Sequence, residues 1–158
     1  MNQETFARLV KQAERTLYRV AMSYTANEAD AADAVQEALL RAWNRRHTLR
    51  EEALFATWLT RIVINECKTL LRRRRRSFPT AKLPEKTEHP CEDGWIRDML
   101  FALPSKERVP LMLHALEGYT FKEIAQMLHL PLGTVKTRVA RARHKLKLEV
   151  LDDADGRT

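Results

Sequence analysis

The side chains of this sequence that are best suited to a chemical task are basic, and they concentrate in two short stretches. Between residues 134 and 149 there are six lysines and arginines but a single acid, Glu149. A second stretch, residues 72–76, consists of five consecutive arginines. Charges of one sign without acidic partners at i,i+4 add little to helix stability, whereas they suit contacts with phosphate groups. Both stretches therefore indicate binding to a polyanion.

Catalytic and metal-binding patterns are missing from the sequence. It contains no Gly-rich phosphate loop, no GxSxG, no HExxH and no cluster of carboxylates around a histidine. The two cysteines, Cys67 and Cys91, are far apart, and a zinc site that also used His89 would lack the usual ligand spacing. We therefore expect neither an enzyme nor a bound metal or other cofactor.

The overall composition favours a helical protein with an acidic partner. The 158 residues carry a net charge of +7, and 44% of them are hydrophobic and 31% charged. Four glycines and six prolines argue against a turn-rich β architecture. No apolar run approaches the roughly 18 residues of a membrane span, and the first residues lack the pattern of a signal peptide. We expect a cytoplasmic protein without a membrane span.

The first half of the chain has the pattern of three amphipathic helices. Apolar residues recur at steps of three and four over residues 4–25, 28–46 and 55–76. Residues 77–93 then hold three prolines and show no periodicity, which is typical of a flexible linker.

Beyond the linker, further helices are predicted from residue 95. The first breaks at Leu103, and Ser105 is the candidate N-cap of the next, which extends to about residue 117. Pro110 falls near the first turn of that helix, where a proline is tolerated, and Gly118 suits its C-cap.

Residues 121–140 have the length and pattern of a helix-turn-helix. Thr120 and Glu123 have capping-box spacing for its first helix, and the second helix extends over residues 134–150. Ala125 is small at the point where two steeply crossing helices come closest. His129 occupies a position where many such units carry glycine. The sequence thus predicts a DNA-binding module in the second half.

The docking geometry of this motif assigns roles to the last helix. Its early residues meet base edges in the major groove, and its later basic residues hold phosphates. Arg141 can form two hydrogen bonds to a guanine, whereas Arg143 and Lys145 are expected to set the register. The candidate duplex-binding residues are Lys136, Thr137, Arg138, Ala140, Arg141 and Arg143.

The second helix of the first half has a polar side. At helical spacing, four of its residues project together and form a face suited to a charged partner helix. They are Asp33, Gln36, Glu37 and Arg41.

We therefore predict an all-α protein with two small helical domains. The domains cover residues 1–76 and 94–150, and the flexible linker between them covers residues 77–93. Residues 151–158 are expected to form a tail.

The order of these segments resembles the extracytoplasmic-function (ECF) group of the sigma-70 family of RNA polymerase sigma factors. Residues 30–43, DAADAVQEALLRAW, resemble the acidic Gln-Glu segment of sigma region 2, and residues 58–65, WLTRIVIN, resemble the segment after it. Residues 133–138, GTVKTR, are similar to part of region 4. The resemblance covers about residues 4–150, and regions 1.1 and 3 have no counterpart, which is the layout of the ECF group.

The resemblance implies a non-enzymatic factor that directs promoter recognition and transcription initiation with core RNA polymerase. It implies that Asp33, Gln36, Glu37 and Arg41 dock on the clamp coiled coil of the β′ subunit, and that region 4 meets the β flap. Region 4 would also bind the minus 35 element of promoter DNA. Many members of the group are controlled by an anti-sigma factor, and no residue here identifies one.

The resemblance also implies that the first domain holds the minus 10 element as a single strand. A base that leaves the stack needs a pocket with polar and aromatic side chains. The candidates are Arg50, Phe55, Trp58, Arg61, Asn65 and Thr69. Phe55 and Trp58 could stack on a base, but their helical spacing favours a place in the protein core.

One alternative from another functional class remains open at this point. A stand-alone helix-turn-helix regulator would use the first domain to bind a ligand or a second copy of the chain. It would form a dimer on a palindromic site and would not need polymerase.

Overall fold

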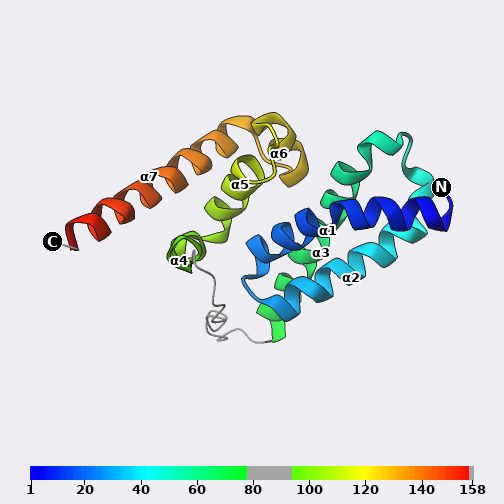
Figure 1. The fold of residues 1–158 in the computed structure, drawn as a ribbon, viewed down its shortest axis with the longest axis horizontal. Coiled ribbons are helices and arrows are strands. Elements are labelled where there is room, and N and C mark those ends of the chain that lie inside the picture. Colours follow the sequence, from blue (N-terminus) through cyan, green and yellow to red (C-terminus); the bar gives the residue numbers. More distant parts are fainter. Residues whose placement is uncertain (78–93, 157–158) are drawn as a thin grey trace. The chain divides into compact units, whose positions relative to one another are not determined.

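The structure is a computed structural model that describes residues 1–77 and 94–156 (Figure 1). The all-α prediction is confirmed, because the described residues form seven α-helices and two short 3-10 turns and no strand. The chain divides into two compact units between residues 87 and 88. Within the described ranges, no helix is both long and apolar enough to cross a membrane.

The first unit is a bundle of three helices, α1 (Gln3–Thr25), α2 (Glu28–Asn44) and α3 (Phe55–Ser77), each in contact with the other two (Figure 1). Two 3-10 turns, Arg46–Thr48 and Glu52–Leu54, connect α2 to α3. Asn2 and Asn27 cap α1 and α2, since their side chains accept hydrogen bonds from the backbone N–H groups three residues later.

Helix α2 packs against its neighbours through a stripe of alanines. The stripe residues are Ala31, Ala34, Ala38 and Ala42, each at most 1% exposed. Their spacing of three and four residues places them on one side of the helix, and their small side chains let the neighbouring backbones approach closely. The larger core side chains come from the other two helices, among them Leu17, Leu59 and Ile64.

Aromatic rings join the ends of the three helices that meet at one end of the bundle. The ring of Phe6 lies edge-on to Trp43 and to Phe55, with centroid distances of 5.1 and 5.6 Å. The guanidinium of Arg46 lies 3.8 Å from the centroid of the Trp43 ring and donates to the Trp43 carbonyl. These contacts tie the start of α1 to the end of α2 and the start of α3.

Two ion pairs fix α2 against α3. Arg41 Nε pairs with Glu66 Oε1, and Arg74 Nη2 pairs with Asp30 Oδ1. Both carboxylates are largely buried, so losing either arginine would leave an uncompensated charge inside the bundle. Burial raises the pKa of the Asp30 carboxyl, and the charge of Arg74 partly offsets this effect.

The second unit contains α4 (Gly94–Ala102), α5 (Ser105–Ala115), α6 (Phe121–Leu128) and α7 (Leu132–Gly156). Its core is formed mainly by aliphatic side chains of the last three helices: Val109, Leu113, Ile124, Met127, Val135, Val139 and Ala142. Ile124, Leu128, Val135 and Val139 of the helix-turn-helix are buried, and Ala125 is half-buried.

Polar contacts hold the connections of this unit in place. The buried Arg108 donates to the carbonyls of Phe101 and Leu103, at 3.3 and 2.9 Å, and burial lowers its pKa to about 10. His114 Nδ1 donates to the Tyr119 carbonyl at 2.9 Å, and its ring stacks on Phe121 with centroids 4.2 Å apart. His114 therefore fixes the loop that leads into α6.

The helix boundaries agree with the sequence pattern in the first unit and differ in detail in the second. Ser105 is the first residue of α5 and not its N-cap. The N-cap is Pro104, whose side chain forms no capping hydrogen bond. Pro110 is the sixth residue of α5 and buried, deeper in the helix than predicted. The cap at the end of α5 is Leu116, two residues before Gly118, which instead adopts a left-handed φ of 75° in the loop.

The final helix is longer than its apolar pattern indicated. It begins at Leu132, two residues early, and continues to Gly156 into the segment expected to be a tail. The Thr120 cap is confirmed, because its Oγ1 accepts from the Glu123 N–H at 3.1 Å. The predicted linker falls almost entirely on residues 78–93, outside the described residues, as do His89 and Cys91.

Within residues 1–77 and 94–156, two residues other than glycine adopt the left-handed conformation, and both lie at helix ends. Ala26 closes α1 with a φ of 49°, and His129 closes α6 with a φ of 55°. A side chain with a Cβ is strained at such a φ, whereas glycine is not. This geometry explains why related motifs carry glycine at the position of His129.

Replacing His129 by glycine should therefore stabilise the second unit. We expect His129→Gly to raise the free energy of unfolding by about 1 kcal/mol, because the left-handed φ no longer costs energy. The matched control is His144→Gly in the middle of α7, which should lower it by about 1 kcal/mol. Urea denaturation followed by circular dichroism measures both, and equal losses in the two variants would contradict the assignment at His129.

Burial should make the Cys67 thiol unreactive. It is fully buried on α3, and burial, with a smaller effect of the Glu66 charge, raises its pKa to about 12. In a Cys91→Ser variant, a thiol reagent at pH 8 should react with Cys67 at least about 100-fold more slowly than in urea, since reaction requires a thiolate and local opening. Absorbance of the released chromophore gives both rates, and similar rates would rule out a closed core.

The raised pKa of the Cys67 thiol also makes the free energy of unfolding depend on pH. The folded thiol ionises at higher pH than the unfolded one, whose ordinary pKa is about 8.5, so its contribution to stability is lost as pH rises from about 9 toward 12. A Cys67→Ala comparison in that window isolates this contribution.

Candidate functional site

The outer face of α2 is polar and exposed, as its helical spacing predicted. Asp33, Gln36 and Glu37 lie opposite the alanine stripe and are all exposed. Leu40 lies on the same face with 57% of its surface exposed, and the sequence analysis missed it. Its position out of phase with the buried stripe is the signal that could have found it.

Arg41 differs from the other three candidates on this helix. Its side chain is 49% exposed, but its guanidinium pairs with Glu66 on α3. Arg41 therefore lies at the edge of the polar face and links α2 to α3.

The exposed side of α3 carries the polar candidates for a single strand. Trp58, Arg61, Asn65 and Thr69 follow one another at steps of three and four residues, so they share one side of the helix. Arg61 and Asn65 are exposed, and Trp58 and Thr69 are half-buried. Thr69 Oγ1 donates to the Asn65 carbonyl at 2.9 Å.

The structure corrects the assignment of Phe55. Its side chain is 2% exposed and packs between the rings of Phe6 and Trp58. A nucleic-acid base cannot stack on it in this packing, so Phe55 belongs to the core. Arg50 is exposed between the two 3-10 turns and lies on neither α2 nor α3.

The five arginines at the end of α3 fall into two groups, one that pairs within the bundle and one that faces solvent. Arg74 is engaged with the buried Asp30, as described above. The other four arginines of residues 72–76 are at least partly exposed, and no carboxylate of the described residues forms an ion pair with them. Arg72 also lowers the pKa of Lys68, whose ammonium is partly desolvated. The end of α3 is thus strongly cationic.

In the second unit, α7 presents an exposed arc opposite its buried Val135, Val139 and Ala142. Thr137, Ala140 and His144 form an outward strip at steps of three and four residues. The strip lies between two basic flanks. One flank holds Lys136, Arg143 and Lys147, and the other holds Arg138 and Lys145, with Arg141 between that flank and the strip.

Lys145 has a different role from the phosphate contact expected of it. Its Nζ lies 2.8 Å from Oε2 of Glu107, whose side chain is 5% exposed at the start of α5. This ion pair holds α7 against α5. His144 was not selected from the sequence, although its spacing from Ala140 and Thr137 places it on the outward strip.

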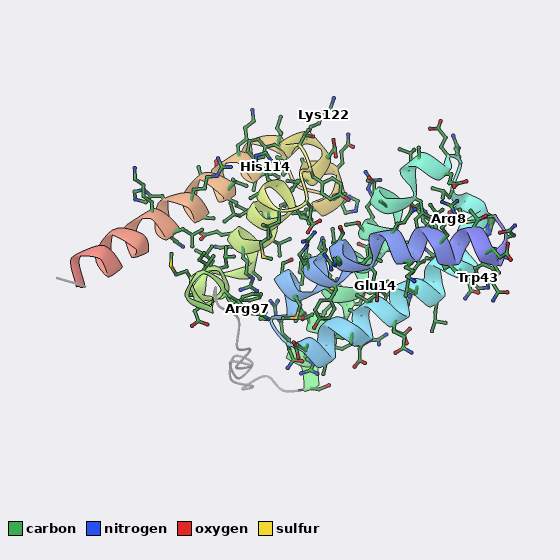
Figure 2. The ribbon with its side chains drawn as sticks, viewed as in Figure 1. Arg8, Glu14, Trp43, Arg97, His114 and Lys122 are labelled. Carbon is green, nitrogen blue, oxygen red and sulfur yellow. The ribbon has the colours of Figure 1, made fainter. Side chains whose placement is uncertain are left out.

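A surface hollow of about 570 Å³ adjoins this second flank of α7. Residues of α5, of the turn before α7 and of α7 itself line it: Lys106, Glu107, Pro131, Gly133, Thr134, Thr137, Arg138 and Arg141. On the first helix of the motif, Lys122 points away from the unit into solvent (Figure 2). Lys106, Lys122 and Arg141 are exposed, whereas Arg138 is half-buried.

Both units match known families. The model of sigma-70 region 2 matches residues 9–77, and that of sigma-70, region 4 matches residues 93–146. Together the two matches cover most of the chain and coincide with the two units.

Similar proteins and solved structures give the same result. The ECF RNA polymerase sigma factor SigM of Mycobacterium tuberculosis is 34% identical over 149 residues, which are 89% of this chain and 74% of SigM. RpoE of Bartonella quintana, solved in complex with the anti-sigma factor NepR, is 25% identical with a TM-score of 0.82, covering 93% of this chain and 96% of that one.

CnrH, solved in complex with the cytosolic domain of CnrY, is 30% identical with a TM-score of 0.70, and the match covers 98% of this chain and 91% of CnrH. The chain thus contains both sigma regions in the order of the family, and a sigma factor more than 30% identical to it is known. The chain belongs to the extracytoplasmic-function group of the sigma-70 family, the sigma factors of RNA polymerase.

Proposed function

We propose that the first unit of this sigma factor binds core polymerase and the minus 10 strand at the same time, through two different faces of a single bundle. The observation that carries the proposal is the arrangement of α2 and α3. Both helices direct a polar face outward, while the alanine stripe and two ion pairs lock them together. A factor of this kind works in the cytoplasm, where the polymerase acts.

The outer face of α2 suits a helical partner with complementary charge. Asp33 and Glu37 supply acidic groups, Gln36 can donate and accept hydrogen bonds, and the exposed Leu40 adds apolar surface. The clamp coiled coil of the β′ subunit is the partner that we propose for this face. Arg41 acts here through its pair with Glu66, which holds the edge of the face in position.

The exposed side of α3 suits an extruded base and the adjacent backbone. Trp58 offers part of a ring surface, Asn65 offers amide donors and acceptors, and Arg61 offers a phosphate contact. Unstacking a base costs a few kcal/mol, which contacts of this kind offset. The arginines that follow on α3 extend the cationic surface along the DNA backbone.

The second unit would read the minus 35 element as duplex through α7. The outward strip faces base edges and the two basic flanks face the phosphates of the two groove walls. RpoE of Bartonella quintana is solved in complex with the anti-sigma factor NepR, and we propose an anti-sigma factor as a further partner of this chain. The β flap is the polymerase element expected to meet this unit. A stand-alone regulator is not favoured, because both units match sigma regions.

Replacing two residues of the α2 face should weaken polymerase binding. We expect Gln36→Ala/Glu37→Ala to reduce the affinity for core polymerase about 10- to 100-fold, since truncations at the centre of an interface dominate its energy. Pull-down with labelled core enzyme and fluorescence anisotropy measure the loss.

The matched control for this experiment is Gln12→Ala/Glu14→Ala, which removes the same two side-chain types from exposed positions on α1 of the same unit. The control should bind as the wild type does. Equal affinities of the two double variants would remove the docking face from α2.

Run-off transcription with core polymerase on a promoter library tests the whole proposal. The wild-type chain should select promoters with two defined elements. Arg141→Ala should relax the preference at one upstream position by about 5- to 100-fold, the value of a lost pair of hydrogen bonds to a guanine. Sequencing of the transcribed templates measures this preference.

Arg15→Ala, an exposed arginine of α1, serves as the charge-matched control and should leave every position unchanged. Unaltered selection by the Arg141 variant would exclude base reading by that side chain. A chain that gives core polymerase no promoter selectivity would refute the function itself.

A further inference from the structure

We propose that the hollow between α5 and α7 binds one phosphodiester group of the DNA backbone, with Lys106 and Arg138 as its two cationic ligands. Lys106 lies on α5, outside the helix-turn-helix. The proposal rests on the proposed function, because it assumes that the outward strip of α7 enters the major groove. It assigns a DNA contact to Lys106 on α5. Neither the sequence pattern nor the helix-turn-helix motif assigns a DNA contact to that helix.

The first support is the position of the hollow. It opens on the flank of α7 that carries Arg138, beside the outward strip of Thr137 and Ala140. When a recognition helix directs such a strip at base edges, its flanks face the groove walls, where the phosphates lie. A group bound in the hollow is therefore a part of the backbone and not a base.

The second support is the balance of charge on the lining. Three cations, Lys106, Arg138 and Arg141, line the hollow together with one acid, Glu107. Glu107 is already neutralised by Lys145, at 2.8 Å. Among the described residues, no carboxylate forms an ion pair with any of the three lining cations. The hollow therefore has a positive charge for which the folded chain supplies no counterion.

The third support is that the ligands come from two helices whose relative position is fixed. Lys106 is adjacent to Glu107, and the pair between Glu107 and Lys145 anchors this start of α5 to the middle of α7. Arg138 is half-buried, so its side chain is more restricted than that of a fully exposed arginine. A lysine and an arginine held in this way can clamp one phosphate from two directions, which sets the register of α7 along the groove.

The test uses the full chain with core polymerase and a promoter fragment selected from the library. The fragment is prepared with a neutral methylphosphonate in place of each upstream phosphate in turn. With the wild-type chain, one substituted position within the minus 35 region should weaken binding by about three- to tenfold, through loss of a charged contact in that hollow. With Lys106→Ala, binding should be weaker from the outset, and substitution at that same position should have little further effect.

Lys106→Arg should restore the sensitivity at that position, whereas Lys11→Ala on the exposed side of α1 should leave the wild-type pattern intact. The proposal is overturned if the methylphosphonate profile of Lys106→Ala matches that of the wild type at every position. Because Lys106 is exposed, its removal leaves the core of the unit intact, and thermal unfolding of the variant should match the wild type.

Failure of the proposed function gives a different result. In that case no promoter is selected, and the full chain is titrated with an unselected 30-base-pair duplex at several salt concentrations. Lys106→Ala should then still bind more weakly than Lys11→Ala, because a backbone contact does not depend on sequence. Equal binding of these two variants would overturn the phosphate site independently of the function.

Discussion

The close approach of α2 to α1 and α3 is the constraint on which the first unit depends. Four alanines on one side of α2 bring the backbones together and leave no room there for larger or polar side chains. Polar groups of α2 that are able to bind a partner then lie on the outer side or pair with a neighbouring helix. Asp33, Gln36 and Glu37 lie on the outer side, whereas Asp30 and Arg41 form ion pairs with residues of α3.

In the second unit, an analogous constraint comes from one ion pair and one buried arginine. Glu107 and Lys145 join α5 to α7, while Arg108 donates to the carbonyls of Phe101, in the last turn of α4, and of Leu103, just after it. These buried polar groups have their partners, so they fix the geometry at little cost. As a result, the exposed side of α7 has a fixed arrangement. The outward strip, which is nearly neutral, lies between the two basic flanks, and the second flank adjoins the hollow.

Apolar periodicity predicted most of the helices, because most of them bury one side of a regular spiral. Helix α5 is an exception, since residues 107–113 are all buried. The all-α class, the three helices of the first half and the cap at Thr120 follow from local spacing. Phe55 could not be assigned in this way, since its periodicity suited both the core and the surface. Packing against Phe6, 49 residues away in sequence, determined the outcome.

Ion pairs between distant segments were equally outside the reach of the sequence pattern. Arg41, Arg74 and Lys145 belong to exposed or basic stretches by local criteria, and each meets a buried carboxylate on another helix. Lys106 escaped notice for the same reason, because the hollow that it lines exists only once α5 and α7 have packed. Local spacing predicts which face of a helix a side chain occupies, whereas its ion-pair partner depends on how the helices pack in the tertiary structure.

The alanine stripe gives the two sides of α2 very different mutational tolerances. On the inner side, almost any enlargement would force the neighbouring helices apart, so these positions have little freedom to change during evolution. On the outer side, substitutions alter the surface without disturbing the fold. Recognition of a partner can therefore be retuned one residue at a time on the same helix whose opposite side keeps the bundle unchanged.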